Sequence, residues 1–126
     1  MNTALWIAQL LLFLIFLYSG FYKSTKSAPE LVAMRQTGVE GLADPLIHFI
    51  GIIELLGSAG IIFPWMLHIL PVLTPVTAVG FALIMVLAAI IHIRRTEYWT
   101  AAGNTFIFAL SVFVAAGRFQ QLSSFS

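Results

Sequence analysis

The 126-residue sequence contains no cysteine. Without thiols the chain forms no disulfide, holds no iron–sulfur cluster through the usual thiolates, attaches no haem through a C-x-x-C-H motif and performs no dithiol chemistry. Any redox role would therefore depend on a cofactor or a partner supplied from elsewhere. The sequence itself predicts no cofactor.

Charge is scarce as well. Six Lys and Arg and five Asp and Glu make up 9% of the chain, the formal net charge is +1, and 60% of the residues are hydrophobic with a mean hydropathy of +1.00. Ordinary soluble domains carry about 25% charged residues, so this composition is typical of an integral membrane protein. Nucleic acid is excluded as a partner because the chain has no extended basic surface.

Motifs for metal binding and for familiar catalytic chemistry are also missing. No H-x-x-E, E-x-x-H or H-x-x-x-H spacing occurs around the candidate polar residues, and no P-loop, dinucleotide fingerprint or Ser-His-Asp arrangement is visible. We therefore predict no metal site and no catalytic residues. A stand-alone enzyme is the less favoured interpretation.

What the chain does have is four long apolar segments. A bilayer core about 30 Å thick needs roughly 17–25 apolar residues per helix, and backbone groups in lipid must be hydrogen-bonded within each segment. The first segment lacks a basic start and a clear cleavage site, so we expect a retained helix rather than a signal peptide. The chain is therefore predicted to be one all-α domain over residues 1–126, a membrane four-helix bundle with spans 3–22, 45–65, 75–93 and 98–117.

The connections contain helix-start signals. Ser27 with Glu30 three residues later matches a capping box and predicts a short interfacial helix over residues 28–36. Residues suited to the N-cap also precede the later spans, two of them directly before a proline. The expected caps are Asp44, Thr74 and Thr96.

Basic residues predict the orientation. Five of the six Lys and Arg lie at or in the first and third connections, whereas only Arg118 lies on the opposite side. The positive-inside rule then places these connections in the cytoplasm and both termini outside. We expect a bacterial inner-membrane protein in which Arg118 is the sole basic residue near the outer surface.

One carboxylate stands inside a span, in the stretch "FIGIIELLGSAG". Glu54 lies about 14 Å from the start of its helix, near the bilayer middle, at a cost of about 2.5–3.5 kcal/mol on insertion scales. It should therefore face the bundle and be protonated or paired. Gly51, Gly57 and Ser58 share its helix face and would let a neighbouring backbone come close.

Other polar side chains are predicted to gather near Glu54. Lys23 ends the first span, His92 ends the third, and Asn104 reaches a depth in the fourth span comparable to that of Glu54. His48 points about 120° away from Glu54 around the second helix and is expected to lie apart. The outer half of the bundle offers little beyond Gln9. The predicted ligand-binding pocket, in the cytoplasmic half, comprises Glu54, Lys23, His92, Asn104, Ser58 and Gly51.

Simpler interpretations stay open for each of these residues. Glu54 and Asn104 could each join two helices without contacting a ligand. Lys23 could be a solvated topology marker, and His92 an interfacial residue that binds nothing.

Four segments together resemble the DoxX-like membrane proteins: "SGFYK", "FIGIIELLGSAGIIFP", "LTPVTAVGFALIMVLAAIIHIRRTE" and "AAGR". The resemblance covers nearly the whole chain, and its most specific features are Lys23, the Gly51–Glu54–Gly57 pattern and His92. It implies a four-helix bundle in the bacterial inner membrane. Relatives in that family serve thiosulfate:quinone oxidation, methylamine dehydrogenase maturation, oxidative-stress complexes and, more remotely, receptor assembly, so the resemblance implies no single mechanism.

The leading hypothesis is a small accessory membrane protein. Its pocket around Glu54 would bind a hydrophobic small molecule, such as a quinone or isoprenoid, or a partner helix, within a redox or stress-response complex. The alternatives are a small proton-coupled exporter and a membrane-protein assembly chaperone. Expected partners are thus the lipid bilayer, a hydrophobic small molecule, and a membrane protein or a second copy of the chain.

Overall fold

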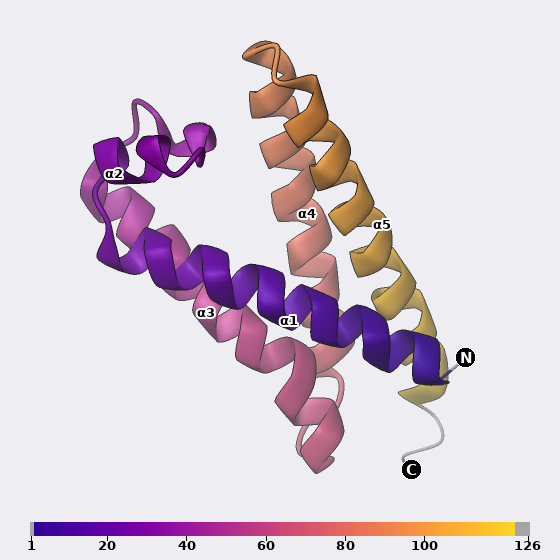
Figure 1. Cartoon of the computed structure of the whole chain (residues 1–126). Coiled ribbons are helices and arrows are strands. Elements are labelled where there is room, and N and C mark those ends of the chain that lie inside the picture. The colour runs from indigo at the N-terminus through magenta and orange to yellow at the C-terminus, as the bar shows by residue number, and fades with distance from the viewer. Residues whose placement is uncertain (1, 123–126) are drawn as a thin grey trace.

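The computed structural model describes residues 2–122, and this part of the chain contains helices and turns but no strand (Figure 1). Four long helices account for most of it, and two short helical segments lie between the first and second of them. In chain order the elements are α1 (Asn2–Thr25), α2 (Ala28–Ala33), η1 (Thr37–Val39), α3 (Asp44–Leu67), α4 (Leu73–Arg94) and α5 (Tyr98–Gln121).

The four long helices confirm the predicted all-α membrane bundle. They contain 24, 24, 22 and 24 residues, and each is long and apolar enough to cross a membrane. Their bounds extend beyond the predicted spans, most clearly at the end of α1, which reaches Thr25, and at the end of α5, which reaches Gln121. Hydropathy detects only the apolar part of a helix, whereas the backbone hydrogen bonding continues into the polar ends.

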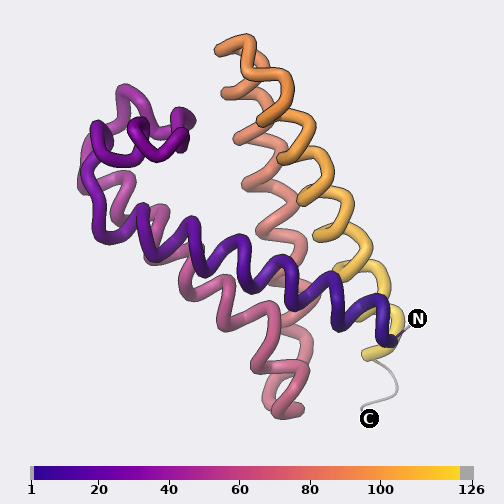
Figure 2. The backbone as a smooth tube through the Cα atoms, in the orientation of Figure 1, coloured from indigo at the N-terminus to yellow at the C-terminus, as the bar shows by residue number. Residues whose placement is uncertain are grey.

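The helices form two pairs. α1 packs along α3, and α4 packs along α5. The pairs meet where α1 begins and α5 ends, and they diverge toward α2 and the α4–α5 turn (Figure 2). We call the first of these regions the terminal end of the bundle and the second the loop end.

Glycines set the close approach of α1 and α3. A Cβ added at Gly20 would lie 2.8 Å from the carbonyl oxygen of Gly51, and a Cβ at Gly51 would collide with the backbone of Lys23 and Ser24. The two backbones therefore touch, as the small-residue face of α3 predicted. Glu54, one turn along α3, is consequently brought opposite α1.

An aromatic stack links the two helix pairs at mid-height. The rings of Phe16 on α1 and Phe81 on α4 lie 3.7 Å apart, with an angle of 8° between their planes. Both side chains are buried, together with Leu12, Ile61 and Met85. This apolar core separates the loop end from the terminal end.

The predicted capping box is present at α2. The Ser27 hydroxyl accepts from the backbone N–H of Glu30 at 3.5 Å, and the Glu30 carboxylate accepts from the backbone N–H of Ser27 at 3.2 Å. The helix ends at Ala33 rather than at residue 36. Arg35 adopts a φ of 68°, which a right-handed helix cannot accommodate.

The three other predicted caps are wrong. α3 begins at Asp44, whose carboxylate accepts from the backbone N–H of Ala28 at 3.1 Å and so holds α2 to α3. Thr74 lies inside α4 and donates to the carbonyl of Gly60 at 3.1 Å, joining α4 to α3. Thr96 donates to the carbonyl of Arg95, and the N-cap position of α5 is occupied by the next residue, Glu97. The first two side chains serve contacts between helices, which local sequence cannot reveal.

The expectation of little polarity at the terminal end beyond Gln9 is also wrong. Arg118 is fully buried, and its Nε donates to Gln9 Oε1 at 2.7 Å. Its Nη1 donates to Asn2 Oδ1 at 2.7 Å and to Gln121 Oε1 at 2.6 Å.

Aromatic rings and a backbone carbonyl complete this arrangement. The Arg118 guanidinium lies 5.2 Å from the Trp6 ring centroid and 4.6 Å from that of Trp65. Gln9 in turn donates to the carbonyl of Ile61 at 2.7 Å. The Arg118 cluster, comprising Asn2, Trp6, Gln9, Trp65, Arg118 and Gln121, thus joins α1, α3 and α5 around one buried cation.

Replacing Arg118 by Lys should destabilise the fold. An ammonium cannot reproduce three directed hydrogen bonds together with contact to two indole faces, so we expect a loss of about 2–4 kcal/mol in the free energy of unfolding. The fraction surviving heating in detergent micelles, followed by size-exclusion chromatography, measures it. R94K, at an exposed position, is the matched control and should leave the midpoint unchanged. Equal midpoints for R118K and R94K would contradict the role of the cluster.

A second test concerns the α1–α3 contact. G51A should lower the free energy of unfolding by about 1–3 kcal/mol, because its new methyl group must push α1 away. G80A adds the same methyl group where nothing lies within 4 Å, and alanine favours helix by about 1 kcal/mol. The same heating assay should therefore separate the two variants in opposite directions. A tolerated G51A would show that the helices do not touch there.

Candidate functional site

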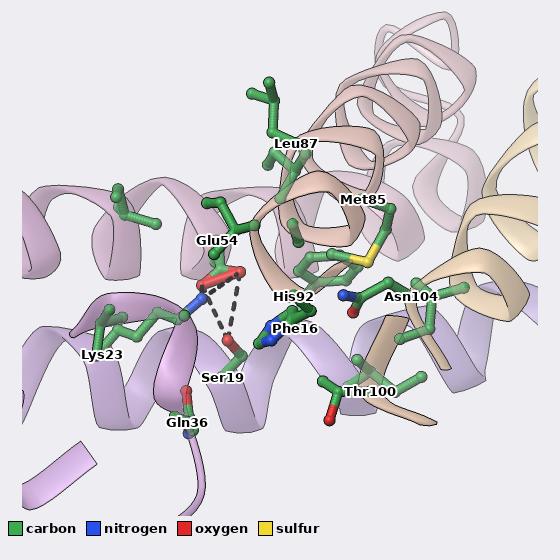
Figure 3. Close-up of a pocket in the computed structure, with 18 of the residues that line it drawn as sticks. Phe16, Ser19, Lys23, Gln36, Glu54, Met85, Leu87, His92, Thr100 and Asn104 are labelled. Atoms are coloured by element: carbon green, nitrogen blue, oxygen red, sulfur yellow. Dashed lines mark hydrogen bonds and ion pairs between the residues drawn. The ribbon is translucent and has the colours of Figure 1, made fainter. Parts of the chain in front are cut away.

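A cavity of about 440 Å³ occupies the loop end between the two helix pairs (Figure 3). All four long helices contribute to its walls, and residues of the segment 35–42, which we call the roof segment, cover it on one side. Most of the lining is apolar, including Phe16, Ile50, Met85 and Ile107. Its volume falls in the range of small-molecule sites, about 300–1,000 Å³.

Glu54 is held on the wall formed by α1 and α3. Its side chain is 1% exposed, and Lys23 Nζ lies 3.1 Å from Oε1 and 3.5 Å from Oε2. Ser19, one turn before Lys23, donates to the same carboxylate at 3.0 Å (Figure 3). The charge of Glu54 is thus balanced within the protein, and the pair joins α1 to α3 at the level of the cavity.

His92 belongs to the opposite wall and is oriented by Glu97. Its Nδ1 lies 2.8 Å from Glu97 Oε1, and Glu97 also accepts from the Thr37 hydroxyl at 2.6 Å. Hydrogen bonds from Thr37 and His92, with the charge of Arg95, lower the pKa of Glu97 to about 2. Because Glu97 is therefore ionised, His92 Nδ1 carries the proton, and Nε2 is an acceptor in the neutral ring. A Cβ on Gly38 in the roof segment would lie 3.2 Å from Nε2.

The roof segment is fastened to the α4–α5 turn. Besides the Thr37–Glu97 hydrogen bond, Arg95 Nη2 lies 3.0 Å from Glu40 Oε2 and Arg95 Nε lies 3.1 Å from Glu97 Oε1. The Thr37–Glu97 and Arg95–Glu40 contacts connect residues 60 and 55 positions apart in the chain. They hold the roof segment across the diverging helix pairs.

Asn104 extends from α5 toward the side chains of Phe16 and His92 (Figure 3). Its Nδ2 is shielded from solvent and has no hydrogen-bond partner within residues 2–122, and the same is true of Gln36 Nε2 in the roof segment. Both residues line the cavity. Shielded amide groups without partners are rare in folded proteins, so these two nitrogens have unused hydrogen-bonding capacity.

The structure brings together four of the six predicted pocket residues: Glu54, Lys23, His92 and Asn104 all line the cavity. Gly51 and Ser58 do not. Gly51 faces the α1 backbone, and Ser58 donates to the Leu55 carbonyl at 2.7 Å, closer to the terminal end.

Other residues were placed less completely by the sequence. His48 lies apart from the cavity, as its angle around α3 predicted, with Nε2 3.2 Å from the carbonyl of Lys26. Ser19 was not predicted as a partner of Glu54. The roof segment and Glu97 were missed, because only the turn geometry brings them to His92.

Fold and cavity together define a small, all-helical integral membrane protein with a cavity between its long helices. The model of the DoxX-like family matches residues 7–114, and the chain belongs to this family. No curated protein and no solved structure matches the chain. All residues that line the cavity fall within the matched region, whereas Arg118 lies beyond it.

The Glu54–Lys23 pair can be tested by removing its members singly and together. K23M should cost about 3 kcal/mol, because it leaves a buried carboxylate without its cation. Adding E54Q should recover most of this loss, since Ser19 can still bond a neutral amide. Thermal midpoints in micelles measure both effects.

The control is K26M. Lys26 forms an exposed pair with Glu30 at 3.8 Å, so its loss should change the free energy of unfolding by less than about 1 kcal/mol. If the double variant is as unstable as K23M, the two residues do not depend on each other.

Proposed function

We propose that this protein is a small accessory protein of the bacterial inner membrane that binds a hydrophobic small molecule, of quinone or isoprenoid type, in the cavity beside Glu54. The observation that carries the proposal is the mainly apolar cavity itself, placed between membrane-spanning helices and bordered by a few polar groups. Such a combination is typical of small-molecule sites.

The level of the cavity supports a ligand drawn from the bilayer. Glu54 and Asn104 belong to helices long enough to span, and neither lies in the first or last turn of its helix. Several lining residues, such as Leu87 and Ile91, are also exposed on the outer surface of α4. A hydrophobic molecule could thus pass from lipid into the cavity without crossing water.

The proposed orientation has the loop end in the cytoplasm and both termini outside. Lys23, Lys26, Arg35, Arg94 and Arg95 lie at the loop end, and the remaining basic residue, Arg118, is buried. This distribution follows the positive-inside rule. The roof segment would then separate the cavity from the cytoplasm.

Two observations weigh against the proton-coupled exporter. An exporter must open its site alternately to both sides, but the Arg118 cluster closes the terminal end with a hydrogen-bonded buried cation. In addition, Glu54 is already paired with Lys23, whereas a carrier needs an acid that alternates between proton and substrate. An assembly chaperone or a partner helix in the cavity would show itself in the experiment below as bound protein instead of bound small molecule.

Native mass spectrometry with endogenous lipids retained tests the proposal. The wild type should keep a small hydrophobic molecule that A88F loses, because Ala88 lines the cavity and a phenyl ring would fill part of it. A109F places the same ring on an exposed position of α5 and should keep the ligand. Identical profiles for A88F and the wild type would exclude the cavity as the binding site.

A further inference from the structure

We infer that the polar group of the cavity ligand is an uncharged hydrogen-bond acceptor, such as a carbonyl oxygen, and that it binds the Asn104 side of the cavity rather than Glu54. The inference rests on the proposed function, because it specifies which chemical class the cavity selects. Four features of the lining carry it.

The first feature is that Glu54 already has its ion-pair and hydrogen-bond partners within the protein. The carboxylate is bonded to Lys23 and to Ser19, with both of its oxygens within 3.5 Å of each partner. A ligand that displaced either partner would have to replace a charge-assisted contact in an apolar environment, which is costly. Glu54 therefore shapes and neutralises this wall.

The second feature is the unsatisfied donor on the other wall. Asn104 Nδ2 has no partner within residues 2–122 and is shielded from solvent. In that setting its N–H groups have lost water without gaining an acceptor, at a cost of about 1–3 kcal/mol. A ligand oxygen placed beside Nδ2 would recover this loss. A hydrocarbon of the same shape would not.

The third feature is a second donor in the roof segment. Gln36 Nε2 is likewise shielded and without a partner in the described chain, and Gln36 also lines the cavity. The shielded polar atoms of the lining that lack a partner in the described chain are thus amide nitrogens, which donate. Neutral ligands with acceptor oxygens match this inventory.

The fourth feature is charge balance. Lys23 is paired with Glu54, and His92 is paired with an ionised Glu97, so no cation inside the helix walls is left for an anionic head group. Arg35, the remaining charged residue on the lining, is an exposed residue of the roof segment. An uncharged head avoids the cost of moving an unpaired charge into this site.

Two probes that differ in a single group test the inference. Decanophenone carries a carbonyl next to its phenyl ring, and decylbenzene has a CH₂ group at that position. Binding of each to the purified full chain in lipid nanodiscs is measured by equilibrium dialysis with mass spectrometric detection, corrected for uptake by empty nanodiscs. We expect the wild type to bind the ketone about tenfold more tightly, as one buried hydrogen bond implies.

Variants then locate the selectivity. N104L should abolish the preference by weakening the ketone about tenfold without weakening decylbenzene. T105L makes a comparable change at the next, exposed residue of α5 and should keep the preference. The ratio of the two probes within each variant is independent of any shared loss of folded protein.

Four outcomes would overturn the inference. Equal affinity of the wild type for both probes, or a preference that survives in N104L, would remove Asn104 as the contact and leave cavity binding intact. Tighter binding of 4-nonylbenzoate than of decanophenone would show that the site takes anions. Failure of every probe to bind, combined with wild-type and A88F proteins that retain the same endogenous molecules, would overturn the proposed function as well.

Discussion

A charged side chain inside a bilayer needs partners within the protein. This fold depends on two such side chains, Glu54 and Arg118, and on the groups that bond them. The partners of Glu54 are an ammonium and a hydroxyl from α1. The partners of Arg118 are side-chain oxygens of three residues and two indole rings. Each arrangement is made between helices, so each joins helices that lipid would otherwise separate without penalty. Together they determine which helices touch and where.

The two buried charges act at different heights of the bundle. The Arg118 cluster joins α1, α3 and α5 at the terminal end, where the two helix pairs meet. The Glu54 pair joins only α1 to α3. It does not hold the α4–α5 pair, which diverges from the α1–α3 pair at the loop end (Figure 1). Because lipid tails are as apolar as the cavity walls, no hydrophobic force closes this gap. The cavity is a consequence of polar contacts that join the helix pairs at the terminal end and that are missing, within residues 2–122, between the long helices of the two pairs at the loop end.

The roof segment covers one side of the cavity and is held there by Glu97. Glu97 accepts hydrogen bonds from Thr37 and His92, and its low pKa keeps it ionised throughout the physiological range. One carboxylate therefore orients a cavity histidine and holds the covering segment at the same time. The sequence left open whether Glu54 joins helices or serves a site. In the structure it joins α1 to α3 and also forms a wall of the cavity, whereas the shielded polar atoms of the lining that lack a partner in the described chain belong to Asn104 and Gln36.

The sequence by itself determined that the chain lies in a lipid bilayer, where its four long helices run, and at which level of each helix the polar residues lie. Apolar runs of sufficient length can only be membrane helices, and helical spacing placed Lys23, Glu54, His92 and Asn104 around one cavity because depth follows directly from the rise per residue. Only the tertiary structure decided which groups were bonded to which. Arg118 looked like a marker of the membrane surface, and Asp44 and Thr74 looked like helix caps, since local sequence does not show the neighbouring helix that offers a better partner. Ser58 lies on the same face of α3 as Glu54, but its hydroxyl donates to the carbonyl of Leu55 in the same helix. Only part of that helix face borders the cavity, and helical spacing alone does not show which part.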